Sequence, residues 1–383
     1  MPIENGKIAI IGDLILDYFK YFKAIKLSPE GPAPIVKKIN EFAKAGGAGN
    51  VANSLFNLGC DVSLIFNLPI NDENQDIKLK NLFDDSIKLR PIFNQSSNPL
   101  PVKIRYYVDD RNFMREDIED IKQSNKELID DAYIENLVNS YDLIVISDYC
   151  KGFISDEIIK KIIKSTNKKS IPLFIDSKNT NLNNFENAFC LKINRIEFNS
   201  LFKDFRILDS DNIVEIKKKI EKAKEFSEIG NLIVTLGSLG SILVTRNNVY
   251  TSEVNNVEIV DITGAGDAFL SAIAFSYLRK LNNYFQCIKH DLDKDDLEFA
   301  NLAASSVISL KGTEPISNKF LKEKSFFRRK NLKVGFTNGC FDIIHPGHIS
   351  LLKEAKENCE YLIVGLNSDL SVKKIKGPNR PIN

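Results

Sequence analysis

The stretch that decides the fold is Val260–Phe269, with the sequence VDITGAGDAF. It predicts a short strand, a glycine-rich turn and then the start of an amphipathic helix built from small residues. Glycines in such a turn let backbone N–H groups converge on one point, where the helix dipole adds partial positive charge. That point suits an anion, in particular the charge that develops on a phosphoryl group during its transfer.

An acidic residue stands next to this turn. Asp267 lies in the first turn of the predicted helix, where a carboxylate can accept the proton of an attacking hydroxyl group. The alternative is an ordinary helix start whose acidic residue only interacts with the dipole, and the spacing alone leaves both interpretations open. The candidate catalytic residues of the stretch are Gly264, Ala265, Gly266 and Asp267.

Strands and helices alternate on the amino-terminal side of the turn. Short apolar runs predict buried strands at residues 8–11, 62–66, 143–147, 172–175 and 232–236. Helical patterns occur at residues 49–58, 156–164, 212–226 and 268–278. The alternation predicts an α/β fold with a doubly wound, mainly parallel sheet that helices cover on both faces. Residues 101–115 (PVKIRYYVDDRNFMR) instead alternate like an exposed strand pair and predict a small accessory sheet.

The composition is that of a globular chain with more than one domain. Its 383 residues exceed one ordinary domain, and 52 basic against 51 acidic residues leave no charge excess to drive nucleic-acid binding. A hydrophobic content of 43% excludes the disordered class. No apolar run approaches the ~18 residues of a membrane helix. A strand predicted as early as Lys7–Ile11 leaves no room for a signal peptide. Six scattered cysteines without a CxxC motif lead us to expect free thiols in the cytoplasm.

A domain boundary is predicted between residues 312 and 330. A Gly-Thr-Glu-Pro sequence ends a helix there, and a short basic run, KEKSFFRRK, follows at 322–330. A strand, a helix and another strand come next, and they predict one β-α-β unit. We therefore divide the chain into a first domain at 1–315, a linker at 316–330 and a second domain at 331–383. The second domain is expected to be truncated, because a nucleotide-binding α/β domain usually needs about 100–150 residues.

The glycine cluster at 45–52 allows a competing interpretation. Its Gly47–Ala52 segment fits the dinucleotide-binding pattern G-x-G-x-x-A. That pattern should follow a strand directly and be answered by an acidic residue about 20 positions later, but Glu41–Lys44 precedes it and Asn67 is not acidic. A dehydrogenase is therefore disfavoured, and the absence of G-x-x-x-x-G-K-[ST] excludes a P-loop kinase.

Two of the three histidines of the chain lie close together in Thr337–His348, TNGCFDIIHPGH. His345 and His348 stand at the predicted start of a helix, where Pro346 suits the first position. Two imidazoles there would form a donor-rich clamp for a triphosphate. The alternatives are a metal pair, for which no further histidine follows, or two surface histidines.

The first domain resembles the ribokinase-like (PfkB) carbohydrate kinases. Val260–Phe269 is similar to the second signature of that family and Ala45–Ala52 to the first, while Gly12-Asp13 closes the first strand as in the family. Ile233–Gly240 is similar to its nucleotide-side loop. The resemblance implies the ribokinase-like fold with an accessory β-sheet lid, and ATP and Mg²⁺ as cofactors.

The second domain resembles the H-x-G-H nucleotidylyltransferases, in which both histidines stabilise the phosphate transition state. Asn367–Asp369 and Lys376–Pro381 are also similar to that superfamily. Thr337, Asn338, His345 and His348 would form its phosphate clamp. The resemblance implies an incomplete Rossmann-like unit, because the carboxy-terminal half with its Ser-Thr-Thr nucleotide motif is missing.

The order of the two domains resembles the bifunctional heptose 7-phosphate kinase/heptose 1-phosphate adenylyltransferases of lipopolysaccharide precursor synthesis. Local sequence at 27–34 and 147–152 agrees, and the resemblance extends over residues 7–383. Three departures affect the substrate and nucleotide loops. Asp176-Ser177-Lys178 replaces Asp-Pro-Lys, Lys192-Ile193-Asn194 replaces a proline-containing version, and Lys26 replaces an arginine.

The kinase resemblance assigns roles to individual residues. Asp267 would be the base, and Gly264, Ala265 and Gly266 would supply the anion hole. Sugar hydroxyl groups would be held by Asp13, Gly46, Gly47 and Asn50. Asn194 and Glu197 would face the phosphates, with Glu197 positioning Mg²⁺ through water. The nucleotide would also contact Thr235, Gly237, Gly240 and Asn301.

A sugar that already carries a phosphate needs cationic side chains to hold it. Lys103, Arg105, Arg111 and Arg115 lie on the accessory segment, with 103 and 105 on one face of a strand. Our hypothesis is that one or two of them bind this phosphate, chiefly among Lys103, Arg105 and Arg115. A solvated strand face is the alternative.

The expected function is transfer of the γ-phosphoryl group of ATP to C1 of D-glycero-D-manno-heptose 7-phosphate. Adenylyl transfer by the second segment is expected to be lost or impaired. The alternatives are a kinase of another sugar or sugar phosphate, and a non-catalytic sensor of sugar phosphate or nucleotide. The expected partners are small-molecule substrates and a second copy of the chain, in a homodimer through the accessory segment, with neither nucleic acid nor a membrane.

Overall fold

The computed structural model describes residues 6–69, 79, 81–94, 100–119, 129–254, 257–283, 291–320, 334–359 and 361–382. The chain divides into two compact units, Met1–Phe320 and Leu321–Asn383. None of the helices in these described ranges is long and apolar enough to cross a membrane.

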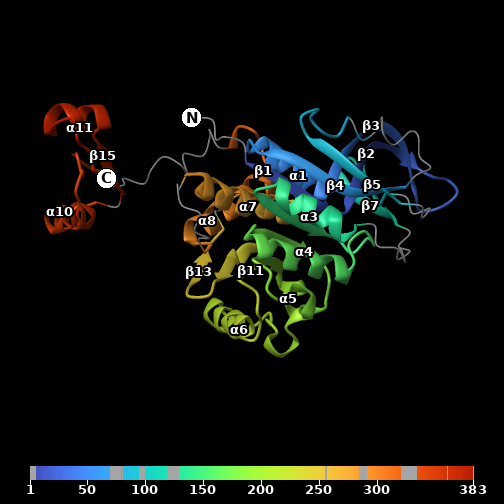
Figure 1. Cartoon of the computed structure of the whole chain (residues 1–383). Helices are drawn as coiled ribbons and strands as arrows, with labels where there is room; N and C mark the ends of the chain where they lie inside the picture. Colours follow the sequence, from blue (N-terminus) through green and yellow to red (C-terminus); the bar gives the residue numbers. More distant parts are fainter. Residues whose placement is uncertain are drawn as a thin grey trace. The chain divides into compact units, whose positions relative to one another are not determined.

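A nine-stranded sheet forms the centre of the first unit (Figure 1), in the order β13-β12-β11-β10-β9-β8-β1-β4-β5. Its strands are β1 (Lys7–Gly12), β4 (Asp61–Pro69), β5 (Lys88–Asn94), β8 (Leu143–Asp148), β9 (Leu173–Ser177), β10 (Cys190–Asn194), β11 (Asn231–Thr235), β12 (Ser241–Val244) and β13 (Val249–Ser252). All neighbours are parallel except β11–β12 and β12–β13. Every residue of β8 is buried, as the continuous apolar runs of a doubly covered parallel sheet predict.

Helices connect these strands. They are α1 (Ala48–Asn57), α3 (Asp131–Ser140), α4 (Asp156–Lys169), α5 (Arg195–Leu201), α6 (Ile213–Glu225), α7 (Ala265–Asn283) and α8 (Lys294–Ile308). α7 packs against both α1 and α8, and α3 packs against α4. The five strands and four helices predicted from the sequence are confirmed, as is the mainly parallel α/β architecture.

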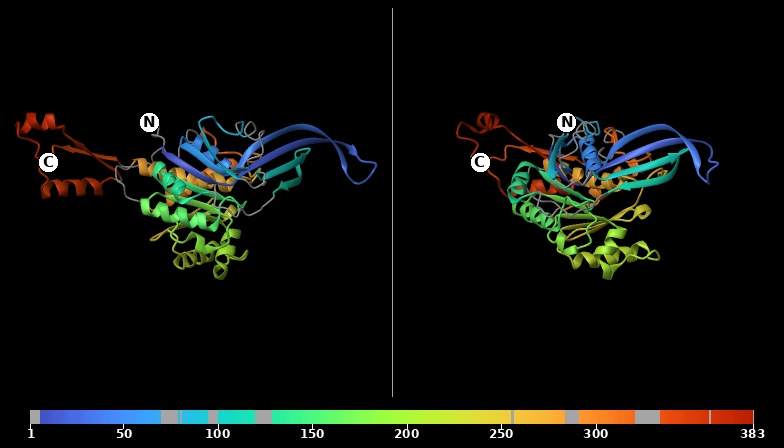
Figure 2. Two further views of the ribbon diagram at one scale, coloured as in Figure 1. Left: turned by 45° about the vertical axis from the view of Figure 1, so that its right-hand side comes forward. Right: turned by 90° about the vertical axis from the view of Figure 1, so that its right-hand side faces the viewer.

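The accessory sheet is larger than expected. It has the order β3-β2-β6-β7, with β2 (Leu14–Leu27), β3 (Pro34–Gly47), β6 (Val102–Val108) and β7 (Arg111–Ile118). The predicted pair is β6 and β7, whose turn residues Asp109 and Asp110 both have positive φ. The long hairpin of β2 and β3, which was not predicted, extends away from the central sheet (Figure 2).

The second unit contains β14 (Val334–Gly339), α10 (Pro346–Glu357), β15 (Tyr361–Leu366) and α11 (Asp369–Lys376). β14 and β15 pair in parallel, which confirms the β-α-β unit. Of the predicted linker, residues 316–320 belong to the first unit, where Ile316 and Phe320 are buried. Residues 321–330 lie outside the described residues.

Candidate active site

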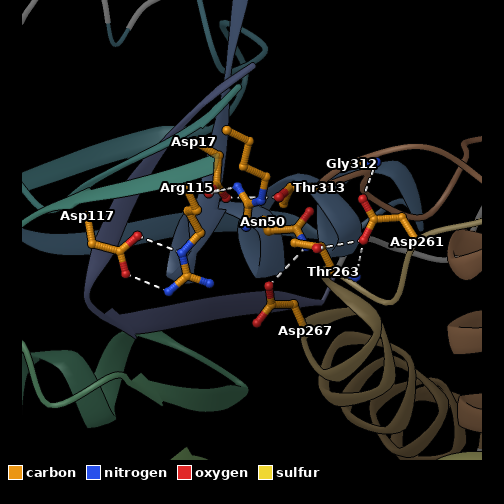
Figure 3. Close-up of polar contacts among 10 residues, drawn as sticks. Asp17, Asn50, Arg115, Asp117, Asp261, Thr263, Asp267, Gly312 and Thr313 are labelled. Carbon is orange, nitrogen blue, oxygen red and sulfur yellow. Dashed lines mark hydrogen bonds and ion pairs between the residues drawn. The ribbon is translucent and has the colours of Figure 1, made fainter. Parts of the chain in front are cut away.

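The glycine turn leads into α7 without the strand that the sequence predicted before it. The N–H groups of Val260 and Asp261 donate to the carbonyl of Ile308 at the end of α8, so this backbone pairs with a helix end instead of a sheet. The Asp261 carboxylate then shapes the turn, accepting from Thr263 N and Oγ1 at 2.9 and 2.7 Å (Figure 3). Gly264 follows with a φ of 82°, a left-handed conformation that favours glycine.

Asp267 is buried at the head of α7, and both of its carboxylate oxygens are hydrogen bonded. Asn50 Nδ2 donates to Oδ2 at 3.0 Å (Figure 3), and the Tyr149 hydroxyl donates to Oδ1 at 2.7 Å. Burial raises the pKa of Asp267 to about 6, although these two hydrogen bonds lower it. A carboxylate with a raised pKa is a stronger proton acceptor than a free one.

Of the predicted sugar residues, Asn50 contacts this carboxylate directly. Asn50 is fully buried in α1, and its Oδ1 atom has no hydrogen-bond partner in the part of the chain that the structure describes. A Cβ atom on Gly264 would lie 2.9 Å from Asn50 Nδ2, so the turn and this amide are in close contact. Gly46 and Gly47 end β3 immediately before α1.

Asp13 lies between β1 and β2 and is linked to Asp267 through one residue. Its Oδ2 atom accepts from the N–H groups of Tyr149 and Lys151 at 2.8 and 3.1 Å. Burial and the nearby Asp148 carboxylate raise the pKa of Asp13 to about 7. Tyr149 therefore binds Asp13 through its backbone and Asp267 through its hydroxyl group. Tyr149 was not among the predicted site residues, although it lies in the segment 147–152 that resembles the bifunctional family.

The predicted phosphate-binding cations lie in different surroundings. Arg105 is buried and pairs with Asp17 at 2.6 Å, and its guanidinium lies over the Phe19 ring. Arg115 forms a bidentate ion pair with Asp117 (Figure 3). Its Nε atom donates to Asp117 Oδ1 at 2.6 Å and its terminal NH2 group donates to Oδ2 at 2.5 Å. Among the described residues, neither Lys103 nor Arg111 is in a salt bridge.

Lys103 instead faces Tyr149. Its Nζ atom lies 5.7 Å from the centre of the Tyr149 ring, and the Nζ atom of Lys178 lies 4.4 Å from the same ring. Burial and the proximity of Lys178 lower the pKa of Lys103. Two ammonium groups thus converge beside the tyrosine that holds Asp267. Lys178, which follows β9, was not among the predicted site residues.

The predicted nucleotide residues lie at the ends of β10 and β11, in the turn after β11, and on α5 and α8. Asn194 and Glu197 form a capping box at the start of α5, in which Glu197 Oε2 accepts from Asn194 N at 2.7 Å. Asn194 is the register partner of Thr235 at the end of β11. Gly237 and Gly240 flank the turn that follows, and Asn301 on α8 donates to Ser241 Oγ at 2.8 Å.

In the second unit, the two histidine rings stack at the start of α10. Their centroids are 3.8 Å apart, and His345 is the residue before the helix, with Pro346 at its first position. Thr337 and Asn338 lie on β14. The buried Asp342 carboxylate accepts from Arg380 at 2.8 Å. This ion pair connects the segment after α11 with the residues that lead to His345. No cluster of three or more potential metal ligands occurs within the described ranges.

Comparison with known proteins separates the same two parts. The pfkB family of carbohydrate kinases matches residues 5–319, and a cytidylyltransferase-like family matches residues 336–382. The Bifunctional protein HldE of Campylobacter jejuni is 32% identical over 400 residues, which cover 99% of this chain and 81% of that protein. HldE of Aliarcobacter butzleri is 31% identical over 411 residues, covering 100% and 82%.

Solved structures show the same fold. Phosphofructokinase-2 from Escherichia coli in complex with fructose-6-phosphate aligns with a TM-score of 0.63 and 17% identity, over 83% of this chain and 97% of that one. Ribokinase from Thermotoga maritima aligns with a TM-score of 0.58 and 21% identity, over 85% and 100%. The first unit therefore has the ribokinase-like fold.

Proposed function

Because the chain belongs to the pfkB family of carbohydrate kinases, and is related to HldE over nearly its whole length, we propose that it phosphorylates D-glycero-D-manno-heptose 7-phosphate at C1, using ATP. The product is the 1,7-bisphosphate, a precursor in ADP-heptose and lipopolysaccharide core synthesis. We place the reaction in the cytoplasm, where ATP is supplied.

The observation that supports phosphoryl transfer most directly is Asp267 at the head of α7, held by Asn50 and Tyr149. The sugar hydroxyl attacks the γ-phosphorus and gives its proton to Asp267. The amides of Gly264 and Gly266 and the positive end of the α7 dipole neutralise the charge on the moving phosphoryl group, whereas the Ala265 N–H group donates to the Ile262 carbonyl at 3.3 Å.

The residues that would hold the nucleotide and its metal fit this reaction. Glu197 lies in the first turn of α5, three residues after Asn194 at the end of β10, and burial together with the Asp176 carboxylate raises its pKa. Mg²⁺ takes few direct protein ligands and keeps its waters, so one carboxylate suffices to position it. When bound, Mg²⁺ neutralises charge on the phosphates of ATP. Thr235, Gly237, Gly240 and Asn301 would border the nucleotide.

Lys103 and Lys178 support a sugar substrate that already carries a phosphate. Both ammonium groups lie beside Tyr149, and the described part of the chain offers neither of them a carboxylate salt-bridge partner. Arg115 is paired with Asp117, but its side chain is 51% exposed, so it can also contact a substrate phosphate. Arg105 is buried and paired with Asp17, and we assign it to holding β6 against β2.

The substrate is tested with a panel of acceptors. We expect heptose 7-phosphate to be phosphorylated with a kcat/KM far above that of ribose, hexoses or nucleosides, and a better unphosphorylated acceptor would refute the assignment. Asp267→Asn should lower kcat by about 10²–10⁴, the range for loss of a general base, with ATP binding nearly unchanged. A sensor would have no turnover to lose.

The accessory sheet would also form the homodimer interface. Its exposed apolar side chains include Ile25, Ile39 and Phe113, which are 61, 65 and 64% accessible. Exposed strands with apolar side chains commonly need a partner. A dimeric mass in light scattering, reduced to a monomer by Ile39→Lys, is the expected result. A monomeric mass for the unmodified chain would refute this part of the proposal.

A further inference from the structure

Lys192 is a buried cation in the middle of β10. The residue is only 4% exposed, and lysine is almost never fully buried without a partner. Its Nζ atom donates to Asp176 Oδ2 at 2.5 Å, and Asp176 is its direct register partner on β9. The pair lies towards the carboxyl ends of parallel strands, where ligands bind in open α/β sheets.

The ammonium group of Lys192 also lies against the head of α7. A Cβ atom on Gly266 would be 3.0 Å from Lys192 Nζ, so the missing side chain leaves the space that the ammonium group occupies. Gly266 directly precedes Asp267. Lys192 is therefore the buried positive charge next to the turn that would hold the transferring phosphoryl group.

The surrounding charges keep this lysine protonated. Burial lowers the pKa of Lys192, but the carboxylates of Asp176 and Glu197, with a smaller contribution from Asp267, outweigh it and raise the pKa above the usual value. An ammonium group has three N–H donors, and among the described residues only Asp176 accepts from it. Two donors remain for a ligand.

We propose that Lys192 is a catalytic residue whose ammonium group binds the phosphoryl group in transfer. The inference rests on the proposed phosphoryl transfer but not on the identity of the sugar. A purely structural ion pair is the competing explanation. A buried pair adds little net stability compared with apolar residues of similar volume, so stability alone explains poorly why this charge is placed here.

The ammonium group keeps its protons throughout the step. The bond between the sugar oxygen and the γ-phosphorus forms, the bond from that phosphorus to the bridging oxygen breaks, and ADP leaves with the electron pair. The hydroxyl proton moves to Asp267. Lys192 neutralises charge on the non-bridging oxygens, as lysine does in other phosphoryl-transfer sites.

The test is Lys192→Met, which removes the charge and preserves most of the side-chain length. We expect kcat to fall by about 10²–10³, the usual cost of losing one preorganised donor, with the KM for the sugar nearly unchanged. Lys219→Met is the matched control, because Lys219 also pairs with an aspartate at 2.5 Å, on α6. It should leave kcat unchanged.

A second variant separates catalysis from charge pairing. If Lys192 served only to compensate Asp176, it would become dispensable once Asp176 is neutral. If Lys192 acts on the phosphoryl group instead, the double variant Asp176→Asn/Lys192→Met should remain as slow as Lys192→Met. Recovery of kcat to within about threefold of Asp176→Asn alone would overturn the proposal. Because the double variant also neutralises Asp176, it does not leave that carboxylate without its cation, and it covers the case in which Lys192→Met fails to fold.

A binding experiment keeps this inference distinct from the proposed substrate. No turnover of heptose 7-phosphate by the unmodified chain would refute the substrate assignment. The role of Lys192 is then measured by titration calorimetry with ADP and aluminium fluoride, a mimic of the phosphoryl group in transfer. The unmodified chain should bind the pair more tightly than ADP alone, and Lys192→Met should lose this gain. An equal gain in both would overturn the proposal.

Discussion

Tyr149→Phe removes one hydroxyl group from the active site and keeps the ring beside Lys103 and Lys178. The lost hydroxyl donates to Asp267 Oδ1 at 2.7 Å, and this hydrogen bond lowers the pKa of Asp267. A hydrogen bond to a charged group contributes about 1.5–3 kcal/mol, and about 1.4 kcal/mol corresponds to one pKa unit. A loss at the low end of that range would raise the pKa of Asp267 from about 6 to about 7.

The sign of the kinetic effect follows from the role of the base. Asp267 must be ionised to accept the hydroxyl proton, so a higher pKa reduces the active fraction on the acid side. At pH 6 that fraction would fall from about one half to about one tenth, and kcat/KM would fall roughly fivefold. At pH 8 both forms would be almost fully ionised, so the loss would largely disappear.

The assay is ADP release measured between pH 5 and 9. Tyr106→Phe is the matched control, because the Tyr106 hydroxyl donates to Glu116 at the same distance of 2.7 Å but lies on the exposed accessory sheet. Its pH profile should match that of the unmodified chain. An acid limb that does not move in Tyr149→Phe, or that moves to lower pH, would refute Asp267 as the titrating base.

Three further outcomes are expected. Lys178→Met should raise the KM for heptose 7-phosphate about tenfold, because a charge-assisted contact to the phosphate is lost. The KM for ATP should stay within about twofold. An unchanged KM for the sugar in steady-state kinetics would contradict the phosphate site. Burial and Asp148 raise the pKa of Asp13 from 3.8 to about 7, so the folded chain holds this proton more tightly than the unfolded chain and loses stability as pH rises across that interval. Asp13→Asn should therefore raise the melting temperature more at pH 8 than at pH 4.5, and equal shifts in thermal unfolding would count against this charge state. A polypeptide of residues 1–383 should show no ATP–pyrophosphate exchange, because its second unit exposes apolar side chains such as Phe336 and Leu366 (68 and 71% accessible); robust exchange would show that prediction to be wrong.

Features that depend on a pattern of contiguous residues could be predicted from the sequence. A continuous apolar run marks each central strand, such as β8, because a parallel strand is buried on both faces. The glycine turn and Asp267 are contiguous, so the head of α7 could be predicted without the rest of the chain. The strand expected at Val260 was wrong, because apolar residues can also lie in irregular backbone: Ile259 and Ile262 are 60 and 73% exposed.

The contacts that complete the site could not be predicted, because they join distant segments. Tyr149 reaches Asp267 across 118 positions, and no spacing rule connects the two residues. From the sequence, Lys192 was noted only as part of a segment that departs from the family pattern, and only the fold places it against Gly266. β2 and β3 were missed because their outer halves are largely exposed and mix apolar with charged residues, so they lack the continuous apolar run that marks a buried strand.

The long hairpin of the accessory sheet begins and ends inside the sugar site. β2 starts directly after Asp13, and β3 ends at Gly47, which is paired with Leu14 and followed at once by α1. No connecting loop separates the arm from the residues proposed to hold the sugar. Any rotation of the β2–β3 hairpin about its base must therefore displace Asp13 and Gly47. A force applied at the distal turn of the hairpin would change the positions of the residues proposed to hold the sugar.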